Sequence, residues 1–197
     1  MKNTLFLLSA VVVILMNTQT AAEAQSYRPT RIFKHGQADI RIGVGVLPTY
    51  AKANARTAVL PVSACLDWML SNQLSLGFSA GYSRYGMSKV SAGKEFIRDY
   101  TNQTFQFAGR FAAHFTRTDN LDIYGGIELG VEHIRIQSES GPFGDFEHLY
   151  GIRPQRSQLR YGACLGFRYA VAPKTTIFGE VGTGIALAQV GVGKRLR

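Results

Sequence analysis

The sequence predicts an all-β chain, an eight-stranded antiparallel transmembrane β-barrel built as an up-and-down meander behind a cleaved signal peptide. Three observations support this prediction. Apolar side chains alternate with small or polar ones, at a period of two, in eight successive segments. Short and long connectors alternate between these segments. The charged residues of the segments share one face and leave the other face almost free of charge.

The N-terminus has the pattern of an export signal. Lys2 precedes a mostly apolar run, TLFLLSAVVVILM at 4–16, and the small residues of Ala22-Glu23-Ala24 suit a cleavage site. We therefore expect residues 1–24 to form a signal peptide, residues 25–35 a short leader and residues 36–197 the barrel. An uncleaved anchor is the alternative, although the apolar run is short for a transmembrane helix.

The clearest strand is expected at 74–83, where Leu74, Leu76, Phe78, Ala80 and Tyr82 alternate with serine and glycine. Successive side chains of an extended strand point to opposite faces, so this segment has one apolar face and one polar face. The other expected strands are 37–46, 59–69, 104–116, 121–135, 158–170, 175–184 and 187–196. Phe178 and Leu187 break the alternation in the last two strands.

The connectors predict an orientation. Short connectors lie at 71–73, 117–120 and 172–174, and longer ones at 47–58, 86–103 and 136–157. The last connector, near 184–186, is short. Short turns on one rim and long loops on the other are typical of outer-membrane barrels, whose short turns face the periplasm. We therefore expect the chain to reside in the bacterial outer membrane with its long loops outside.

The charged face predicts what fills the lumen. Its members are Asp39, Arg41, Asp67, Gln106, Arg110, His114, Asp122, Glu128, Glu132, Arg160, Arg168, Glu180, Gln189 and Arg195. Acids and bases are nearly balanced in this set, which predicts a network of ion pairs across the lumen. Room for it would come from Gly43, Gly77, Gly81, Gly126, Gly130, Gly162 and Gly166. Small eight-stranded barrels fill their interior with side chains.

The opposite face predicts contact with lipid. Its ionisable exceptions are His133 and Lys194, both near strand ends, where an amphipathic side chain can reach headgroups. Aromatic residues lie near both sets of connectors and predict two girdles, formed by Trp68, Phe115 and Tyr169 at the short turns and by Phe105 and Tyr161 at the long loops. A soluble β-sandwich or lipocalin-like carrier, whose charged face points to water, is the alternative.

These segments resemble the small outer-membrane β-barrel proteins of the OmpA/OmpX type, and within that group the outer-membrane β-barrel domains common in Bacteroidetes-like bacteria. The resemblance rests on VLPVSACLDWMLSNQLSLGFSAGYS at 59–83, GRFAAHF at 109–115, LDIYGGIELG at 121–130 and TTIFGEVGTG at 175–184. It spans about residue 36 to the end and is a pattern of strands and turns, not a catalytic signature. Such barrels usually end on an aromatic residue that the assembly machinery reads, whereas this chain ends Lys194-Arg195-Leu196-Arg197.

We expect no catalytic residue, no metal ligand and no cofactor-binding residue. His114 and His133 fall on opposite faces and rims, while His35 and His148 lie in the leader and in a loop, so no metal-ligand spacing arises. The glycines of 43–45 and 182–184 are expected inside strands and not before a helix, unlike phosphate-binding loops.

The two cysteines are expected to be free. Cys65 and Cys164 both fall on the lumen face, in strands two and six. Those strands lie on opposite walls of an eight-stranded barrel, too far apart for a disulfide.

The function expected is that of a non-catalytic outer-membrane protein with a structural or surface-binding role through its extracellular loops. The formal net charge of +9 favours anionic headgroups, and its scattered cations do not predict nucleic-acid binding. The expected partners are outer-membrane lipid and lipopolysaccharide, the assembly machinery, and an extracellular ligand or host surface. Phe143, Phe146, Leu149 and Tyr150 of the third long loop either bind a ligand or pack onto the rim, and we favour packing.

Two further functions are alternatives. One is a narrow porin-like channel for small solutes, which a lumen crowded with charges disfavours. The other is a lipid A-modifying enzyme, for which His133 would lie near the outer rim with Glu132 pointing inward beside it. No serine is clearly placed within reach of His133 in the sequence.

Overall fold

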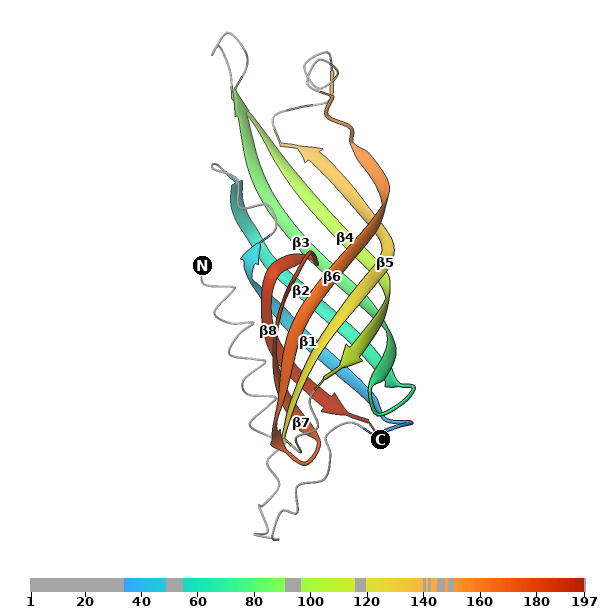
Figure 1. Ribbon diagram of the computed structural model, residues 1–197. Coiled ribbons are helices and arrows are strands. Elements are labelled where there is room, and N and C mark those ends of the chain that lie inside the picture. Colours follow the sequence, from blue (N-terminus) through green and yellow to red (C-terminus); the bar gives the residue numbers. More distant parts are fainter. Residues whose placement is uncertain are drawn as a thin grey trace. The chain divides into compact units, whose positions relative to one another are not determined.

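Eight antiparallel strands close into a meander barrel in which each strand pairs with its neighbours in sequence and β1 pairs with β8 (Figure 1). The computed structural model describes residues 34–48, 55–90, 97–115, 120–139, 141, 143–144, 148 and 151–196. The strands are β1 (Ala38–Pro48), β2 (Ala55–Met69), β3 (Leu74–Val90), β4 (Ile97–His114), β5 (Leu121–Ser138), β6 (Gln155–Ala172), β7 (Thr175–Gly182) and β8 (Ala186–Arg195). The expected fold class is therefore confirmed. The expected signal peptide lies outside the described residues and stays a prediction.

The strand registers define the stagger of the barrel. Starting at Tyr169 of β6, the paired positions run through Ile177, Val192 and Ile42 and continue around the wall to Leu159 of β6. The path therefore returns to β6 ten residues from its start, the difference between positions 169 and 159. Eight strands with such a stagger enclose a lumen just wide enough for side chains to fill.

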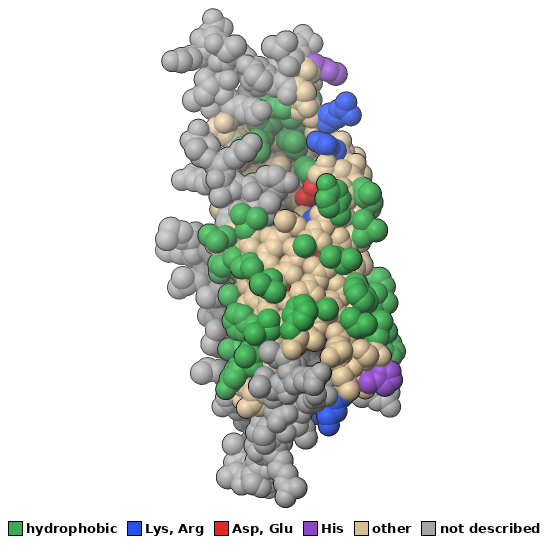
Figure 2. All heavy atoms as spheres, viewed as in Figure 1, with side chains coloured by type: hydrophobic (Ala, Val, Ile, Leu, Met, Phe, Trp, Pro, Cys, Tyr) green, Lys and Arg blue, Asp and Glu red, His purple; other side chains and the backbone are tan. Residues whose placement is uncertain are grey.

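The outer face of the wall is an apolar belt (Figure 2). Phe78, Ile127 and Leu129 expose 69%, 64% and 61% of their surface, although their neighbours in sequence point inward or are small. The expected girdle residues Trp68, Phe115, Tyr169, Phe105 and Tyr161 are all exposed on this face. A soluble sheet protein would bury such a face, so the belt is a surface for hydrocarbon. No helix among the described residues is long and apolar enough to cross a membrane.

The strands differ from expectation at their outer ends. The segment 86–103, expected to be a long loop, is largely the paired continuation of β3 and β4, which stay in register from Leu74↔Ala113 to Val90↔Ile97. In the same way β2 begins at Ala55, and β5 and β6 reach Ser138 and Gln155. These extensions lie beyond the apolar belt, where neither face needs to be apolar, so the alternation that marks a membrane strand is absent from them.

The outer rim is uneven because the last two strands are short. β7 has 8 residues and β8 has 10, compared with 18 in β6. β6 pairs with β7 only between Cys164 and the short turn that joins the two strands. β1 pairs with β2 only as far out as Val44↔Val62. The outermost wall is consequently built by β2 to β6, and Figure 1 shows the β7–β8 hairpin ending well short of these strands.

The two residues that break the alternation have structural reasons. Phe178 points into the lumen and is 4% exposed. Leu187 points outward, beside a register shift at which Leu47 pairs with Ala188 and Pro48 with Ala186. Such a bulge changes the face on which the following side chains lie. The strand expected at 175–184 ends at Gly182, so Thr183 and Gly184 belong to the turn and not to the strand.

Candidate functional site

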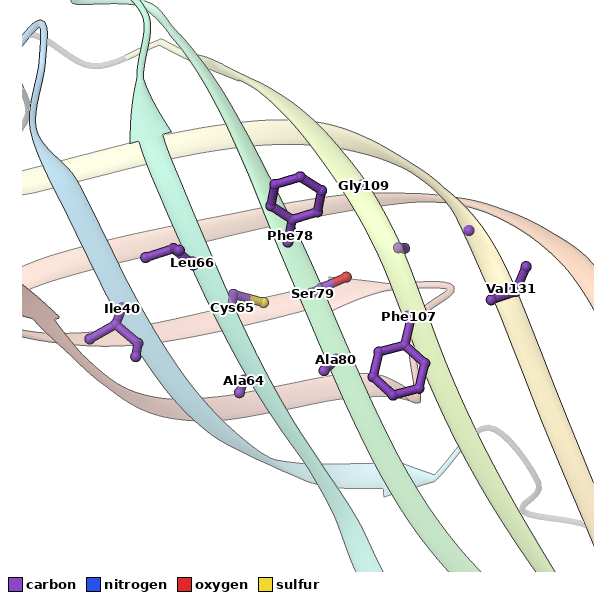
Figure 3. Close-up of a pocket in the computed structure, with 12 residues that line it drawn as sticks. Ile40, Ala64, Cys65, Leu66, Phe78, Ser79, Ala80, Phe107, Gly109 and Val131 are labelled. Carbon is purple, nitrogen blue, oxygen red and sulfur yellow. The ribbon is translucent and has the colours of Figure 1, made fainter.

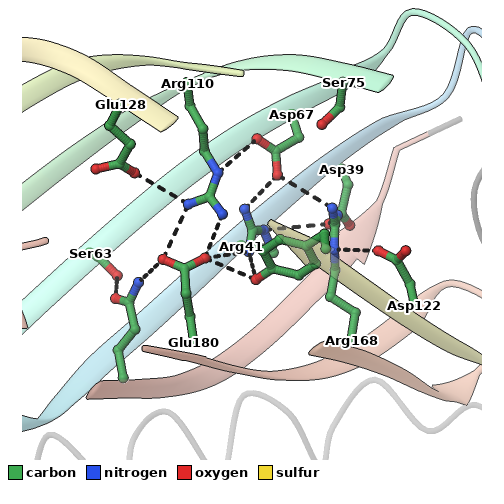
Figure 4. Close-up of polar contacts among 12 residues, drawn as sticks. Asp39, Arg41, Ser63, Asp67, Ser75, Arg110, Asp122, Glu128, Arg168 and Glu180 are labelled. Atoms are coloured by element: carbon green, nitrogen blue, oxygen red, sulfur yellow. Dashed lines mark hydrogen bonds and ion pairs between the residues drawn. The ribbon is translucent and has the colours of Figure 1, made fainter. Parts of the chain in front are cut away.

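The candidate site is the lumen, where three arginines and several carboxylates form one buried network (Figure 4). Arg41 of β1, Arg110 of β4 and Arg168 of β6 are 1%, 2% and 0% exposed. They come from three different strands, and their guanidinium groups lie close together in the lumen. A charge buried to this extent persists only when it is paired and hydrogen-bonded.

Arg41 of β1 contacts residues of three other strands, β2, β5 and β7. Its Nη2 donates to Asp67 Oδ2 of β2 at 2.5 Å, and its Nη1 lies 3.5 Å from Glu180 Oε2 of β7. The same Nη1 donates to the hydroxyl of Tyr124 at 2.7 Å. The guanidinium also lies over the ring of Phe178, 5.1 Å from its centroid. The Phe178 ring therefore faces the lumen, where it stabilises the buried Arg41 guanidinium by a cation–π contact.

Arg110 and Glu180 form the most complete pair. Arg110 Nη1 and Nη2 donate to the two carboxylate oxygens of Glu180 at 3.2 and 2.5 Å, a bidentate arrangement. Nη1 also reaches Glu128 Oε1 at 3.3 Å, and Arg160 donates to the second oxygen of Glu128 at 3.1 Å. Gln189 donates to Glu180 at 2.7 Å, which adds a neutral partner to this carboxylate.

Arg168 links the remaining carboxylates. It donates to Asp39 Oδ2 at 2.8 Å and lies 3.3 Å from Asp122 Oδ2 and 3.7 Å from Asp67 Oδ2. Asp39 and Asp67 are each 2% exposed. The arrangement therefore holds opposite charges in contact across the lumen, as the near-balance of the sequence predicted.

Tyr124 is the residue that sequence reasoning missed. It is 0% exposed, donates its hydroxyl to Glu180 Oε2 at 2.9 Å, and lies within 5.4 Å, ring centroid to guanidinium, of all three arginines. Its position between Asp122 and Gly126 places Tyr124 on the lumen face of β5, but the alternation of apolar and polar residues does not mark an aromatic side chain as a lumen residue. The tyrosine supplies both a hydroxyl and a ring to the network.

The predicted lumen residues face the lumen. Ten of them are buried, namely Asp39, Arg41, Asp67, Gln106, Arg110, His114, Asp122, Glu132, Arg168 and Glu180. Glu128, Arg160, Gln189 and Arg195 are half-buried. Two of the predicted glycines show why small residues are needed: a Cβ on Gly166 would lie 2.5 Å from Tyr124, and one on Gly77 would overlap Asp67. Cys65 and Cys164 are free thiols, as expected.

His114 belongs to the same interior. Its Nδ1 lies 2.9 Å from Asp122 Oδ2 and its Nε2 lies 2.9 Å from Ser75 Oγ. This order of groups is that of a hydrolytic triad. Ser75 is only 1% exposed, however, and Asp122 also pairs with Arg168, so the chain of bonds satisfies buried polar groups and offers no entry for a substrate.

His133 corrects one expectation. The sequence indicated no serine within its reach, but the register places Ser157 of β6 opposite it, and His133 Nδ1 lies 2.9 Å from Ser157 Oγ. The pair lies on the outer face, where His133 pairs across the β4–β5 register with Phe105 of the expected outer girdle. Glu132 does not orient this histidine, because its carboxylate accepts hydrogen bonds from Gln106 and Gln158 inside the barrel.

The outer end of the wall carries a recess of about 490 Å³, lined among others by Arg135, Gln137, Phe143 and Pro154. The Phe143 ring lies 6.4 Å from that of the buried Tyr100, so this loop aromatic packs onto the rim as favoured. Phe146, Leu149 and Tyr150 lie outside the described residues. The described residues contain no group of three side chains able to hold a metal ion.

A closed eight-stranded barrel with an apolar outer belt and a filled, charged lumen is the fold of the small outer-membrane β-barrel proteins. Among solved structures it is similar to OprG of Pseudomonas aeruginosa, with 11% identity, a TM-score of 0.53, and coverage of 85% of this chain and 100% of that one. It is also similar to Ail, the attachment invasion locus protein of Yersinia pestis, solved with the heparin analogue sucrose octasulfate (12% identity, TM-score 0.45, coverage 82% and 96%). Neisserial surface protein A has 14% identity, a TM-score of 0.43 and coverage of 81% and 93%. No protein-family model and no curated protein matches the chain.

Proposed function

We propose that the chain is a closed, non-conducting outer-membrane barrel with a structural or surface-binding role that its outer surface performs without catalysis. The observation that carries this proposal is the buried network around Arg41, Arg110 and Arg168. Side chains that are paired with one another across the lumen leave no continuous path for a solute. The chain therefore has to interact with its surroundings through its lipid-facing and extracellular surfaces.

The outer surface is large enough for such a role. β3 to β6 continue beyond the apolar belt, and the recess beside Arg135 opens there. The partners that we propose are lipid and lipopolysaccharide around the belt and an extracellular ligand or a host surface at the outer end. The assembly machinery of the outer membrane would insert the chain.

Two measurements test this proposal. In a planar bilayer the refolded mature chain should show no stepwise conductance, and regular single-channel steps would favour the porin-like alternative. Replacing 86–103 with a short turn should then abolish binding of barrel-displaying cells to a host-cell or matrix surface. The heat-dependent shift in gel mobility that marks a folded barrel should remain in the shortened chain. Binding that survives the replacement would refute the role of this extension.

A lipid-modifying enzyme is the second candidate, and the His133–Ser157 pair favours it. A serine hydroxyl hydrogen-bonded to a histidine is the core of many acyl-transfer sites, and this pair faces outward next to the level of the lipid headgroups. The test compares the lipid A mass profile of cells that express the wild type with that of cells that express Ser157→Ala. A mass difference equal to one acyl chain would establish the enzyme, and identical profiles would remove it.

A further inference from the structure

The outer wall contains an apolar hollow of about 470 Å³ (Figure 3). The bottom of this hollow, which opens toward the lipid, is formed by three small residues: Ala64 of β2, Ala80 of β3 and Gly109 of β4. Its sides include Phe78 and Phe107, whose rings project from the wall in Figure 3. A hollow with these walls, placed inside the apolar belt, has the shape and polarity to hold a hydrocarbon chain.

A row of polar side chains crosses the same strands further out. Arg84 of β3 pairs with Gln103 of β4, and Gln103 pairs with Arg135 of β5. The two arginines are thus two strand spacings apart, about 10 Å, and their long side chains can converge on one group over Gln103. Arg84 lies four positions after Ala80 on β3, which is about 13 Å along the strand.

The positive charges of this row are not neutralised by ion pairs within the described part of the protein. Neither Arg84 nor Arg135 forms an ion pair there, and Arg84 Nε is buried without a hydrogen-bond partner among the described residues. The nearest acids further outward are Asp99 of β4, four positions from Gln103, and Glu139, just after the end of β5 and four positions from Arg135. Arginine pairs readily with phosphate, and its planar fork suits bidentate contact.

We propose that the hollow and the Arg84–Arg135 row together form one binding site for a phosphorylated lipid of the outer leaflet, with an acyl chain in the hollow and a phosphate on the two arginines. This inference rests on the proposed function, because it assigns a partner to the lipid-facing surface. His133 and Ser157 border the row on β5 and β6 and offer further polar contacts to the headgroup.

Native mass spectrometry of the refolded mature chain tests the site, with synthetic diphosphoryl lipid A and its dephosphorylated form as probes. Wild type should bind diphosphoryl lipid A with higher affinity than the dephosphorylated form. R84Q/R135Q should weaken that binding about 25-fold, because each cation near an anionic surface changes affinity about fivefold. Ala80→Leu fills the hollow and should weaken binding of both forms.

K174Q/K194Q is the matched control, because it removes two exposed cations at the opposite rim and should leave both affinities unchanged. Equal loss in R84Q/R135Q and in this control, or equal affinity of wild type for the two probes, would overturn the site. Arg135→Gln alone serves the same comparison if the double variant lacks the heat-dependent gel shift. Bilayer conductance of the same preparations tests the closed lumen separately, so failure of the proposed function is distinguishable from failure of this site.

Discussion

Replacing Arg110 with methionine should destabilise the barrel by about 3–5 kcal/mol. The side chain of Arg110 is 1% exposed and donates to both oxygens of Glu180, at 3.2 and 2.5 Å. Methionine preserves most of the volume but removes the cation, so among the described residues Glu180 keeps only Arg41, at 3.5 Å, as an ionic partner. Most of the cost is therefore the desolvation of a carboxylate that has lost its main partner.

A double-mutant cycle separates this effect from lost packing. Glu180→Gln retains an acceptor for Tyr124 and removes the charge, so R110M/E180Q should cost less than the sum of the single variants by about 2 kcal/mol. The assay is reversible unfolding by denaturant in lipid vesicles, followed by the fluorescence of Trp68, the single tryptophan of the chain. Lys174→Met, in an exposed turn, is the control and should stay within about 0.5 kcal/mol of wild type. A cost below about 1 kcal/mol for Arg110→Met, or strict additivity in the cycle, would refute the reasoning.

Three further predictions concern the wall and the lumen. Phe78→Arg places a cation in the middle of the apolar belt and should cost about 2–4 kcal/mol in vesicle unfolding, and a negligible cost would argue against lipid at this face. Gly166→Ala forces a Cβ against the central tyrosine and should cost about 1–3 kcal/mol, whereas Gly109→Ala, whose nearest neighbour lies 3.8 Å away, should be nearly neutral in the same assay. Cys65 and Cys164 should both be alkylated after unfolding without reductant, giving a mass shift of two labels, and a shift of zero would reveal a disulfide.

The fold could be predicted from the sequence because the membrane imposes a simple rule on each residue. Inside the belt, the environment of a side chain depends only on the face of the wall to which it points, so alternation at a period of two is sufficient. Arg41 and Asp67 could be assigned to the lumen on this basis. The rule fails beyond the belt, where outward-facing positions such as Arg84 and Asp99 are no longer apolar, and those extensions were expected to be a loop.

The details of the lumen could not be predicted because they depend on the stagger of the strands. A face assignment does not say which residues meet across the barrel, so Tyr124 was not recognised as the centre of the network. The same limit applies to His133 and Ser157, which lie 24 positions apart and become neighbours only through the β5–β6 register.

The seam between β1 and β8 has a consequence for the order of assembly. Its partners, such as Asp39 and Arg195, lie more than 150 positions apart in the chain, and closing so long a segment costs about 4 kcal/mol in entropy. Two ion pairs of the lumen, Arg168–Asp39 and Arg41–Glu180, link β1 to β6 and β7 beside this seam. These bonds form only when the first strand meets the last ones, so a chain that has inserted its middle hairpins but has not closed would carry unpaired charges in its interior. Closure should therefore be the cooperative last step of folding, and a truncated chain that lacks β8 should fail to fold as a whole.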